Sequence, residues 1–247
     1  MLWLPASVGT LAMANDLSQL SFFTESYPPY NYRESHELKG IAVDLLLAAV
    51  SKVDDRLDPN SIQLVPWARG YKLTLSGVNT VLFSTTRTPF REPMFEWVGP
   101  IATTRVVLFA PTAKQLKIAN IADIKKHMIG TIRDDIGEQA VLNMGVPRTQ
   151  IMQAHNAHSL LYMLQRERID MWAYEEFVGR WLIKRAAIKI DEFEAVYTLK
   201  ESELYYAFSL DSDPKLRALL QLGVDRVKAN IQENGLSEYQ NILSKYQ

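Results

Sequence analysis

The stretch Ser84-Thr-Thr-Arg-Thr-Pro-Phe-Arg91 decides how this chain is interpreted, and it directly follows an apolar strand pattern at Thr80-Val-Leu-Phe83. Its eight residues include two arginines and four residues with hydroxyl groups. Arginine presents a rigid fork of donors that fits a carboxylate through two hydrogen bonds, and hydroxyls and free backbone N–H groups at a strand end add more donors. The stretch therefore predicts a site for a small anion. An isolated R-x-x-x-R pattern by itself favours the alternative, a polar turn whose arginines lie in solvent.

The composition is that of an ordinary globular protein. The chain has 247 residues, of which 47% are apolar and 22% are charged, so it can form one large domain or two smaller ones. Its net charge of −1 gives no broad basic field, which argues against nucleic acid and anionic membranes as partners. The sequence contains no cysteine, which excludes disulfides, thiolate metal sites and cysteine nucleophiles and fits an oxidising compartment.

Residues 1–16 are interpreted as the remnant of a secretory signal peptide. Residues 1–14 are mostly small or apolar and end in Ala12-Met13-Ala14, an A-x-A-like cleavage pattern, before the polar pair Asn15-Asp16. The segment is short, contains Pro5 and lacks a basic start, so a disordered leader is the alternative. No other stretch of the sequence is long and apolar enough to span a bilayer. We therefore expect a mature chain that is secreted into the periplasm.

Strand and helix patterns alternate along the whole chain. Runs rich in β-branched and aromatic residues predict strands at 20–24, 62–65, 80–83, 106–110, 128–132, 169–174 and 203–208. Helical spacing of apolar residues predicts helices at 41–53, 68–75, 138–144, 158–166, 178–187, 214–230 and 236–246. This alternation predicts an α/β fold with mostly parallel sheets. No Ser/Gly-rich linker marks a domain boundary, so two lobes joined by crossing strands at 106–110 and 205–209 are one arrangement that fits.

Six motifs stand in the order found in one known family. They are Tyr27-Pro-Pro-Tyr-Asn-Tyr32 with Lys39-Gly-Ile-Ala-Val-Asp-Leu45, Pro66-Trp-Ala-Arg69, Thr86 to Arg91, Phe95-Glu-Trp-Val-Gly-Pro-Ile101, Glu167-Arg-Ile-Asp170 to Glu175, and the helix pattern from Gly235 to Tyr246. With them, residues 20–246 resemble the family 3 extracellular solute-binding proteins, the periplasmic type that binds polar amino acids. Each motif alone is weak, and the order of all six makes the resemblance specific.

The resemblance implies a periplasmic-binding-protein type II fold, in which two α/β lobes, joined by two crossing hinge strands, close on a ligand. It implies that residues 17–107 and 207–247 form lobe 1 and that residues 108–206 form lobe 2. A zwitterion buried between lobes must have both charges paired, because an unpaired buried charge costs several kcal/mol. An arginine on one lobe and a carboxylate on the other would pair both charges and would make binding depend on closure.

For the acidic end of a ligand, the resemblance implies contacts from both lobes. Arg91 would bind an α-carboxylate through two hydrogen bonds, and Thr86 would add its backbone N–H and its hydroxyl. Ser84, at a position where the family usually has glycine, would offer a backbone contact. The loop from Asp134 to Gly137 would present backbone N–H groups at the start of a helix.

For the ammonium end, the resemblance implies one carboxylate and two aromatic rings. Glu175 stands at the position of the family's acidic residue, and Tyr30 and Trp67 stand at the positions of aromatics that enclose the ligand. An aromatic face attracts an ammonium by about 0.5 to 2 kcal/mol. A core position is the alternative for Trp67, since large apolar side chains usually lie in the core.

Several residues depart from the family's pattern. Arg69 and Arg87 add positive charge near the expected site, where they either face solvent or suit a second acidic group on the ligand. The pair Asp134-Asp135 at a helix start is ordinary capping, yet it would repel a ligand carboxylate. Glu175 is one methylene longer than the aspartate of the family. The ligand therefore need not be a plain α-amino acid.

A metal site is not favoured by the sequence. His155 and His158 lie three residues apart at a helix start, but no third ligand has a suitable spacing. Surface positions are the favoured interpretation of both histidines, and we expect neither a metal nor a cofactor.

The sequence thus predicts a binding protein and not an enzyme. It would capture an amino acid or a related carboxylate by hinge closure, as a monomer, for an ABC-type uptake transporter. One alternative is an enzyme on the same scaffold that resembles cyclohexadienyl dehydratases, with Glu175 or Glu176 as a general acid. The other is a ligand sensor, which would be free-standing because the sequence contains no kinase segment.

Overall fold

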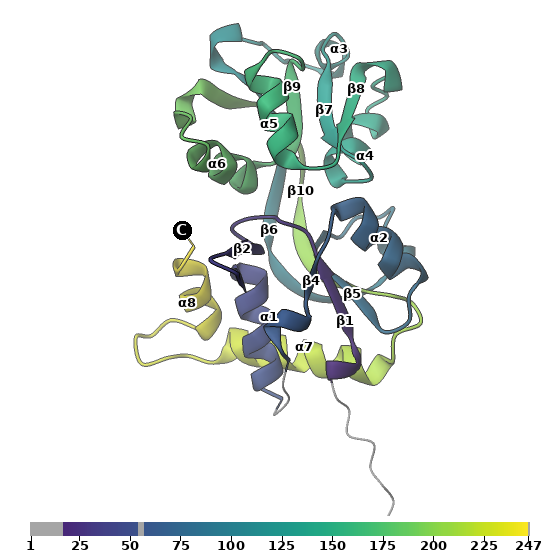
Figure 1. Cartoon of the computed structure of the whole chain (residues 1–247), viewed down its shortest axis with the longest axis vertical. Coiled ribbons are helices and arrows are strands. Elements are labelled where there is room, and N and C mark those ends of the chain that lie inside the picture. The colour runs from purple at the N-terminus through teal and green to yellow at the C-terminus, as the bar shows by residue number, and fades with distance from the viewer. Residues whose placement is uncertain (1–16, 54–56, 247) are drawn as a thin grey trace, which may run out of the picture.

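The structure is a computed structural model that describes residues 17–53 and 57–246. The stretch interpreted as a signal-peptide remnant lies outside the described residues. Figure 1 shows two lobes, one above the other, connected by two long strands that run through both. Within the described ranges, none of the helices combines the length and the apolar composition needed to cross a bilayer.

An eight-stranded sheet extends through both lobes in the order β4-β1-β5-β10-β6-β9-β7-β8 (Figure 1). Its strands are β1 (Ser21–Thr24), β4 (Gln63–Leu64), β5 (Thr80–Thr86), β6 (Glu96–Pro111), β7 (Ile129–Ile132), β8 (Ile151–Ala154), β9 (Met171–Glu175) and β10 (Phe193–Phe208). The outer strand pairs are parallel, and the central pairs β5–β10, β10–β6 and β6–β9 are antiparallel. A separate hairpin consists of β2 (Tyr32–Glu34) and β3 (Glu37–Lys39). The predicted α/β fold is confirmed.

The helices divide between the two lobes. The lower lobe of Figure 1 carries α1 (Ile41–Ser51), α2 (Trp67–Ser76), α7 (Pro214–Ala229) and α8 (Glu238–Ser244). The upper lobe carries α3 (Ile121–Ile124), α4 (Ile136–Asn143), α5 (Ala157–Gln165) and α6 (Glu176–Arg185). The lower lobe is therefore built from both ends of the described chain, and the upper lobe from its middle.

Capping residues fix where helices begin in both lobes. The Asn156 side chain accepts the backbone N–H of Ser159 at 2.9 Å, at the start of α5. Pro214 occupies the first turn of α7, and the preceding Asp213 accepts the backbone N–H of Lys215 at 2.8 Å. Both helices agree with the periodicity-based prediction to within one residue at each end.

Strands β6 and β10 form the connection between the lobes. Each has 16 residues, and they pair in antiparallel register over their whole length. The register shifts at three places along β10, and such bulges allow a strand to bend locally. The crossing run predicted at 106–110 lies within β6, and the one predicted at 205–209 lies within β10 except for its last residue. The lobe boundaries that we propose, after residues 107 and 206, fall inside them.

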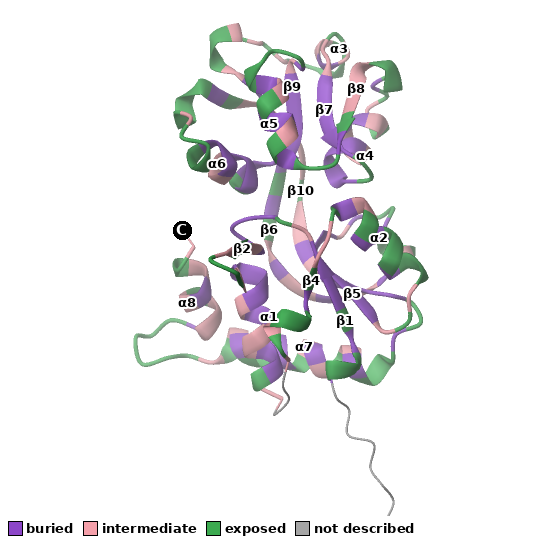
Figure 2. Ribbon diagram, viewed as in Figure 1, coloured by how far each residue is buried: buried purple, intermediate pink, exposed green. Residues whose placement is uncertain are grey.

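The sheet lies at the centre of the buried core (Figure 2). Every residue of β5 and β9 is buried, which agrees with strands covered by helices on both faces. Glycines allow close packing around the sheet. A Cβ atom at Gly223 of α7 would overlap the backbone of Ala49 in α1, and one at Gly179 of α6 would overlap the ring of Phe109 in β6.

Candidate ligand-binding site

Arg91 lies between the two lobes and is fully buried, with 0% of its surface exposed. Its Nη1 donates to the carbonyl of Thr86 at 3.2 Å, and its Nη2 donates to the carbonyl of Asp134, on the other lobe, at 3.1 Å. The guanidinium carbon lies 5.0 Å from the ring centre of Trp67 and 5.3 Å from that of Tyr71. One arginine thus joins the loop after β5 to the start of α4.

One donor of this arginine has no partner. The Nε of Arg91 is buried and has no hydrogen-bond acceptor among the described residues. A buried donor without an acceptor costs about 1 to 3 kcal/mol, and more when the group is charged. Burial lowers the pKa of Arg91, and the nearby Asp135 carboxylate raises it. The guanidinium is thus a buried cation with an open donor position.

Asp134 contributes its backbone to this site. Its φ of 60° lies in the left-handed region, and its carbonyl accepts hydrogen bonds from Arg91 and from Nε1 of Trp67, the latter at 3.0 Å. Its N–H donates to the carboxylate of Glu138 at 2.7 Å. The Asp134 carbonyl therefore faces the lower lobe and its N–H faces Glu138 of the upper lobe, while Asp134 as a whole is exposed.

Ser84 also has a left-handed backbone, with φ of 59°. Glycine adopts this conformation at little cost, which gives a physical reason for the glycine that the family usually has there. The Ser84 hydroxyl donates to the side chain of Asn31, whose Nδ2 donates to the carbonyl of Glu25 at 2.7 Å. The serine thus connects β5 to the loop after β1.

Aromatic rings from both lobes meet beside this site. The rings of Tyr27 and Tyr30, in the loop after β1, stack with centroids 5.7 Å apart. Tyr27 meets Tyr174 of β9 edge-on at 5.7 Å, and Tyr30 meets Phe177 of α6 edge-on at 6.1 Å. All of these residues except Phe177 are buried. The two lobes are therefore in contact through these rings.

Glu175 lies at the end of β9 with only 2% of its surface exposed. Its carboxylate accepts the backbone N–H of Val178 at 2.7 Å and so caps the start of α6. Burial raises the pKa of Glu175 to about 7, although hydrogen bonds to the carboxylate oppose the shift. The neighbouring Glu176 pairs with Arg180 of the same helix at 2.8 Å and with Arg105 of β6.

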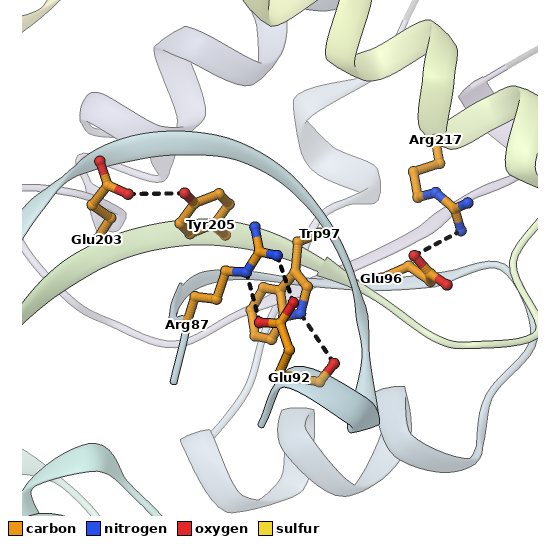
Figure 3. A network of polar contacts seen from close by, with 7 residues as sticks. All are labelled: Arg87, Glu92, Glu96, Trp97, Glu203, Tyr205 and Arg217. Carbon is orange, nitrogen blue, oxygen red and sulfur yellow. Dashed lines mark hydrogen bonds and ion pairs between the residues drawn. The ribbon is translucent and has the colours of Figure 1, made fainter. Parts of the chain in front are cut away.

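Two arginines named from the sequence do not join this site. Arg69 is exposed on α2 and has no described side-chain partner. Arg87 is bound to Glu92, with Nε at 2.8 Å from the carboxylate, and lies over the rings of Trp97 and Tyr205 at 5.6 and 5.2 Å (Figure 3). Its charge is therefore neutralised on the surface of the lower lobe.

Two cavities near Arg91 are lined by residues of both lobes. One, of about 640 Å³, has Tyr71 and Asp134 in its wall, and both of these residues contact the arginine. The other, of about 290 Å³, has Glu25 and Pro66 in its wall, together with His155 and His158 of the upper lobe. Arg91 itself lines neither cavity.

No group of three or more residues suited to a metal ion occurs in the part of the chain that the structure describes. His155 and His158 are both exposed.

Sequence reasoning missed two members of the site. Tyr71 lies four residues after Trp67, a spacing that puts both rings on one side of a helix, and this spacing could have identified it. Glu25 belongs to no motif, and only the fold brings it near Arg91.

No protein-family model matches the sequence, and no curated protein matches it either. Solved structures do match. The chain is similar to the crystal structure of a histidine kinase sensor domain with similarity to periplasmic binding proteins, with a TM-score of 0.77 and 17% identity, covering 92% of this chain and 95% of that one. It is also similar to the substrate-binding protein of an amino acid ABC transporter, with a TM-score of 0.72 and 16% identity, covering 92% of this chain and 98% of that one.

A third similar structure is an ancestral amino acid-binding protein described as a precursor of cyclohexadienyl dehydratase. The TM-score is 0.70 at 16% identity, and the match covers 91% of this chain and 94% of that one. Likeness at this level of identity establishes the fold. The chain has the two-lobed periplasmic-binding-protein fold, in agreement with the resemblance to the family 3 solute-binding proteins.

Proposed function

We propose that this protein binds a small polar ligand, an amino acid or a related carboxylate, between its lobes. The observation that carries the proposal is the buried Arg91, whose guanidinium bonds to carbonyls of both lobes and whose Nε–H has no acceptor among the described residues. A carboxylate is the group that best satisfies such a donor, because it accepts two parallel hydrogen bonds from a guanidinium.

The neighbouring groups suit the other end of an amino acid. Glu175 is a buried carboxylate that can pair with an α-ammonium, and the rings of Tyr30 and Trp67 can enclose the ligand. Thr86 and Ser84 add polar contacts from the lower lobe. Since Arg91 is fully buried, a ligand enters only when the lobes separate by bending at the two long strands.

Delivery to an ABC-type uptake transporter in the periplasm is the cellular role that we propose. The likeness to a substrate-binding protein of an amino acid ABC transporter supports this role. The likeness to a histidine kinase sensor domain favours a ligand sensor as the second candidate. A permease or a kinase that binds the closed, ligand-loaded protein in a pull-down experiment would distinguish the two roles.

An enzyme on the same scaffold is a further candidate because of Glu175. A buried carboxyl group with a pKa of about 7 can act as a general acid at neutral pH, and one similar structure is described as the precursor of a dehydratase. Assays with prephenate and arogenate test this candidate, and turnover that disappears in Glu175→Gln would favour it over simple binding.

The binding proposal is tested by a thermal-shift screen of the twenty amino acids and small carboxylates, followed by calorimetry. We expect at least one compound to raise the melting temperature, and we expect Arg91→Ala to lose binding by about 100-fold or more. Arg168→Ala is the matched control, because this arginine is exposed on the upper lobe and should leave affinity unchanged. A folded protein that responds to none of the compounds would contradict the proposal.

A further inference from the structure

The closed cleft contains more negative charge than a simple amino acid requires. A zwitterion needs one cation and one anion from the protein, and Arg91 and Glu175 supply them. Two further carboxylates lie in the same region. Asp135 of the upper lobe is only 6% exposed, and Glu25 of the lower lobe is partly exposed.

These two carboxylates interact with each other and with Arg91. Burial raises the pKa of Glu25, Asp135 raises it further, and Arg91 lowers it. Burial also raises the pKa of Asp135, which Arg91 and the backbone N–H groups at the start of α4 lower. Neither carboxylate forms an ion pair within the described residues. With every group ionised, Arg91 therefore faces two acids, and Glu175 adds a third negative charge to the cleft.

Glu25 also lines the cavity of about 290 Å³ between the lobes. Leu64, Val65 and Leu182 provide apolar wall, and Glu25 is the carboxylate among the lining residues. An unbranched aliphatic chain that ends in a cation fits such a wall, since its stem packs on apolar groups while its charge pairs with the acid. The volume is near the lower end of the range of small-molecule sites, roughly 300 to 1,000 Å³.

The unpaired Nε–H of Arg91 is an independent sign of a ligand. This donor is completely buried and has no acceptor in the described part of the chain, so the arginine retains capacity for a carboxylate despite the nearby Asp135. Glu25 and Asp135, which have no counter-charge of their own, therefore favour a ligand with a second positive charge.

We infer that this cleft selects a cationic amino acid, whose α-carboxylate lies on Arg91 and whose side-chain cation lies between Glu25 and Asp135. The inference rests on the proposed binding function. Its physical reason is that closure over a neutral amino acid leaves two acids without a counter-charge, which must then be protonated at a cost, whereas a cationic side chain compensates them directly.

Calorimetry with L-lysine, L-arginine, L-glutamine, L-glutamate and cadaverine tests the inference. We expect lysine or arginine to bind at least about tenfold tighter than glutamine, and glutamate to bind weakest. Glutamine or glutamate binding as tightly as the cationic amino acids would overturn this inference and leave the proposed function standing. Binding of none of the amino acids would overturn both. Cadaverine binding as tightly as lysine would uphold charge selection and remove the role of Arg91 in binding a carboxylate.

Variants test the residues themselves. Glu25→Gln and Asp135→Asn keep the shape of each side chain, and asparagine keeps the capping ability of aspartate. Each should weaken lysine or arginine binding about tenfold or more and leave glutamine binding nearly unchanged. Glu233→Gln removes the same charge from an exposed loop before α8 and should change neither. An unchanged ratio of lysine to glutamine affinity in both cleft variants, with circular dichroism showing folded protein, would overturn the inference.

Discussion

Ser84 shows how one backbone angle can outweigh side-chain chemistry. Its φ of 59° strains every residue except glycine by roughly 1 to 2 kcal/mol, and its hydroxyl compensates by bonding to Asn31. A substitution that removes the hydroxyl and keeps the Cβ atom therefore loses the compensation and retains the strain.

We expect Ser84→Ala to be less stable than Ser84→Gly by about 1 kcal/mol in urea denaturation. Ser76, an exposed residue at the end of α2, is the control. At this helical position the order should be reversed, because alanine favours a helix over glycine by up to about 1 kcal/mol. The same order at both positions would show that the left-handed angle is not what matters at position 84.

Glu175 should make stability depend on pH. Its pKa is raised from 4.5 to about 7, so the folded state binds more protons than the unfolded state between these values. Stability from this group therefore falls as pH rises from about 4.5 to about 7, by an amount on the order of 3 kcal/mol, and then stays level. Below pH 4.5 the carboxyl is protonated in both states and contributes no slope.

The test compares the free energy of unfolding against pH for the unchanged protein and for Glu175→Gln. Two profiles are needed because Glu25 and Asp135 also have raised pKa values and change stability in the same direction. Glu175→Gln should lose part of the slope between pH 4.5 and 7. The groups that face this carboxyl, namely Tyr30, Glu176, Thr104 and the backbone N–H of Arg105, remain in the variant. If the two profiles run parallel, Glu175 is already ionised in the folded protein between pH 4.5 and 7.

The sequence could predict the part of the site that is local in the chain. Arg91 and Thr86 belong to one continuous stretch, so their contact follows from a single turn. The direction of the Asp134 carbonyl could not be predicted, because it depends on a left-handed φ and on how the two lobes meet. The same holds for Glu25, which becomes important only through residues far from it in the chain.

At the level of elements, the close packing of two helices requires a glycine where they touch. Gly223 lies where α7 touches α1, and a Cβ atom there would overlap the backbone of Ala49. Backbone cannot move aside as a flexible side chain can. The glycine is therefore required by the approach of two helices and not by its own conformation.

Gly223→Ala should destabilise the protein by about 1 to 3 kcal/mol, although helix propensity alone predicts a gain of about 1 kcal/mol. The control is Leu222→Ala on the exposed side of the same helix, where 44% of the side chain is accessible and the change should stay within about 0.5 kcal/mol. Chemical denaturation measures both. A stabilised Gly223→Ala variant would show that α1 and α7 do not approach this closely.

Elements with strong periodicity were predicted well, and some of the short ones were missed. Helices α5 and α7 agree within a residue because their apolar faces and caps lie in one segment. Strand β8 and the hairpin of β2 and β3 were missed. They have three or four residues each and few fully buried ones, so their pairing partners, and not their own pattern, make them strands.

At the level of the whole molecule, contacts on the surface hold the lobes together. The β2–β3 hairpin of the lower lobe reaches α6 of the upper lobe, where Tyr32 meets Trp181 with ring centroids 5.4 Å apart. Beside them, Arg185 of α6 pairs with Glu34 of β2 at 3.0 Å. These contacts join the two lobes without touching Arg91, so under the proposed hinge closure they would favour the closed form.

Removing the ion pair should shift the protein toward the open form. We expect Arg185→Ala to have a larger radius of gyration in X-ray scattering and an affinity for its ligand about two- to fivefold weaker, as fits an exposed pair worth up to about 1 kcal/mol. Arg180→Ala is the matched control on the same helix, since Arg180 pairs with Glu176 inside its own lobe. Equal effects of the two variants would contradict a role for the hairpin in closure.

The path of the chain through the sheet also determines the order in which the molecule can be completed during its synthesis. Strand β5 lies in the lower lobe, yet its neighbour is β10, where Val81 pairs with Phe208. A nascent chain that leaves the ribosome therefore carries β1, β4 and β5 with an unpaired edge until the last quarter has been translated. The upper lobe, made from the middle of the sequence, can assemble first, and the lower lobe must wait for the C-terminal segment.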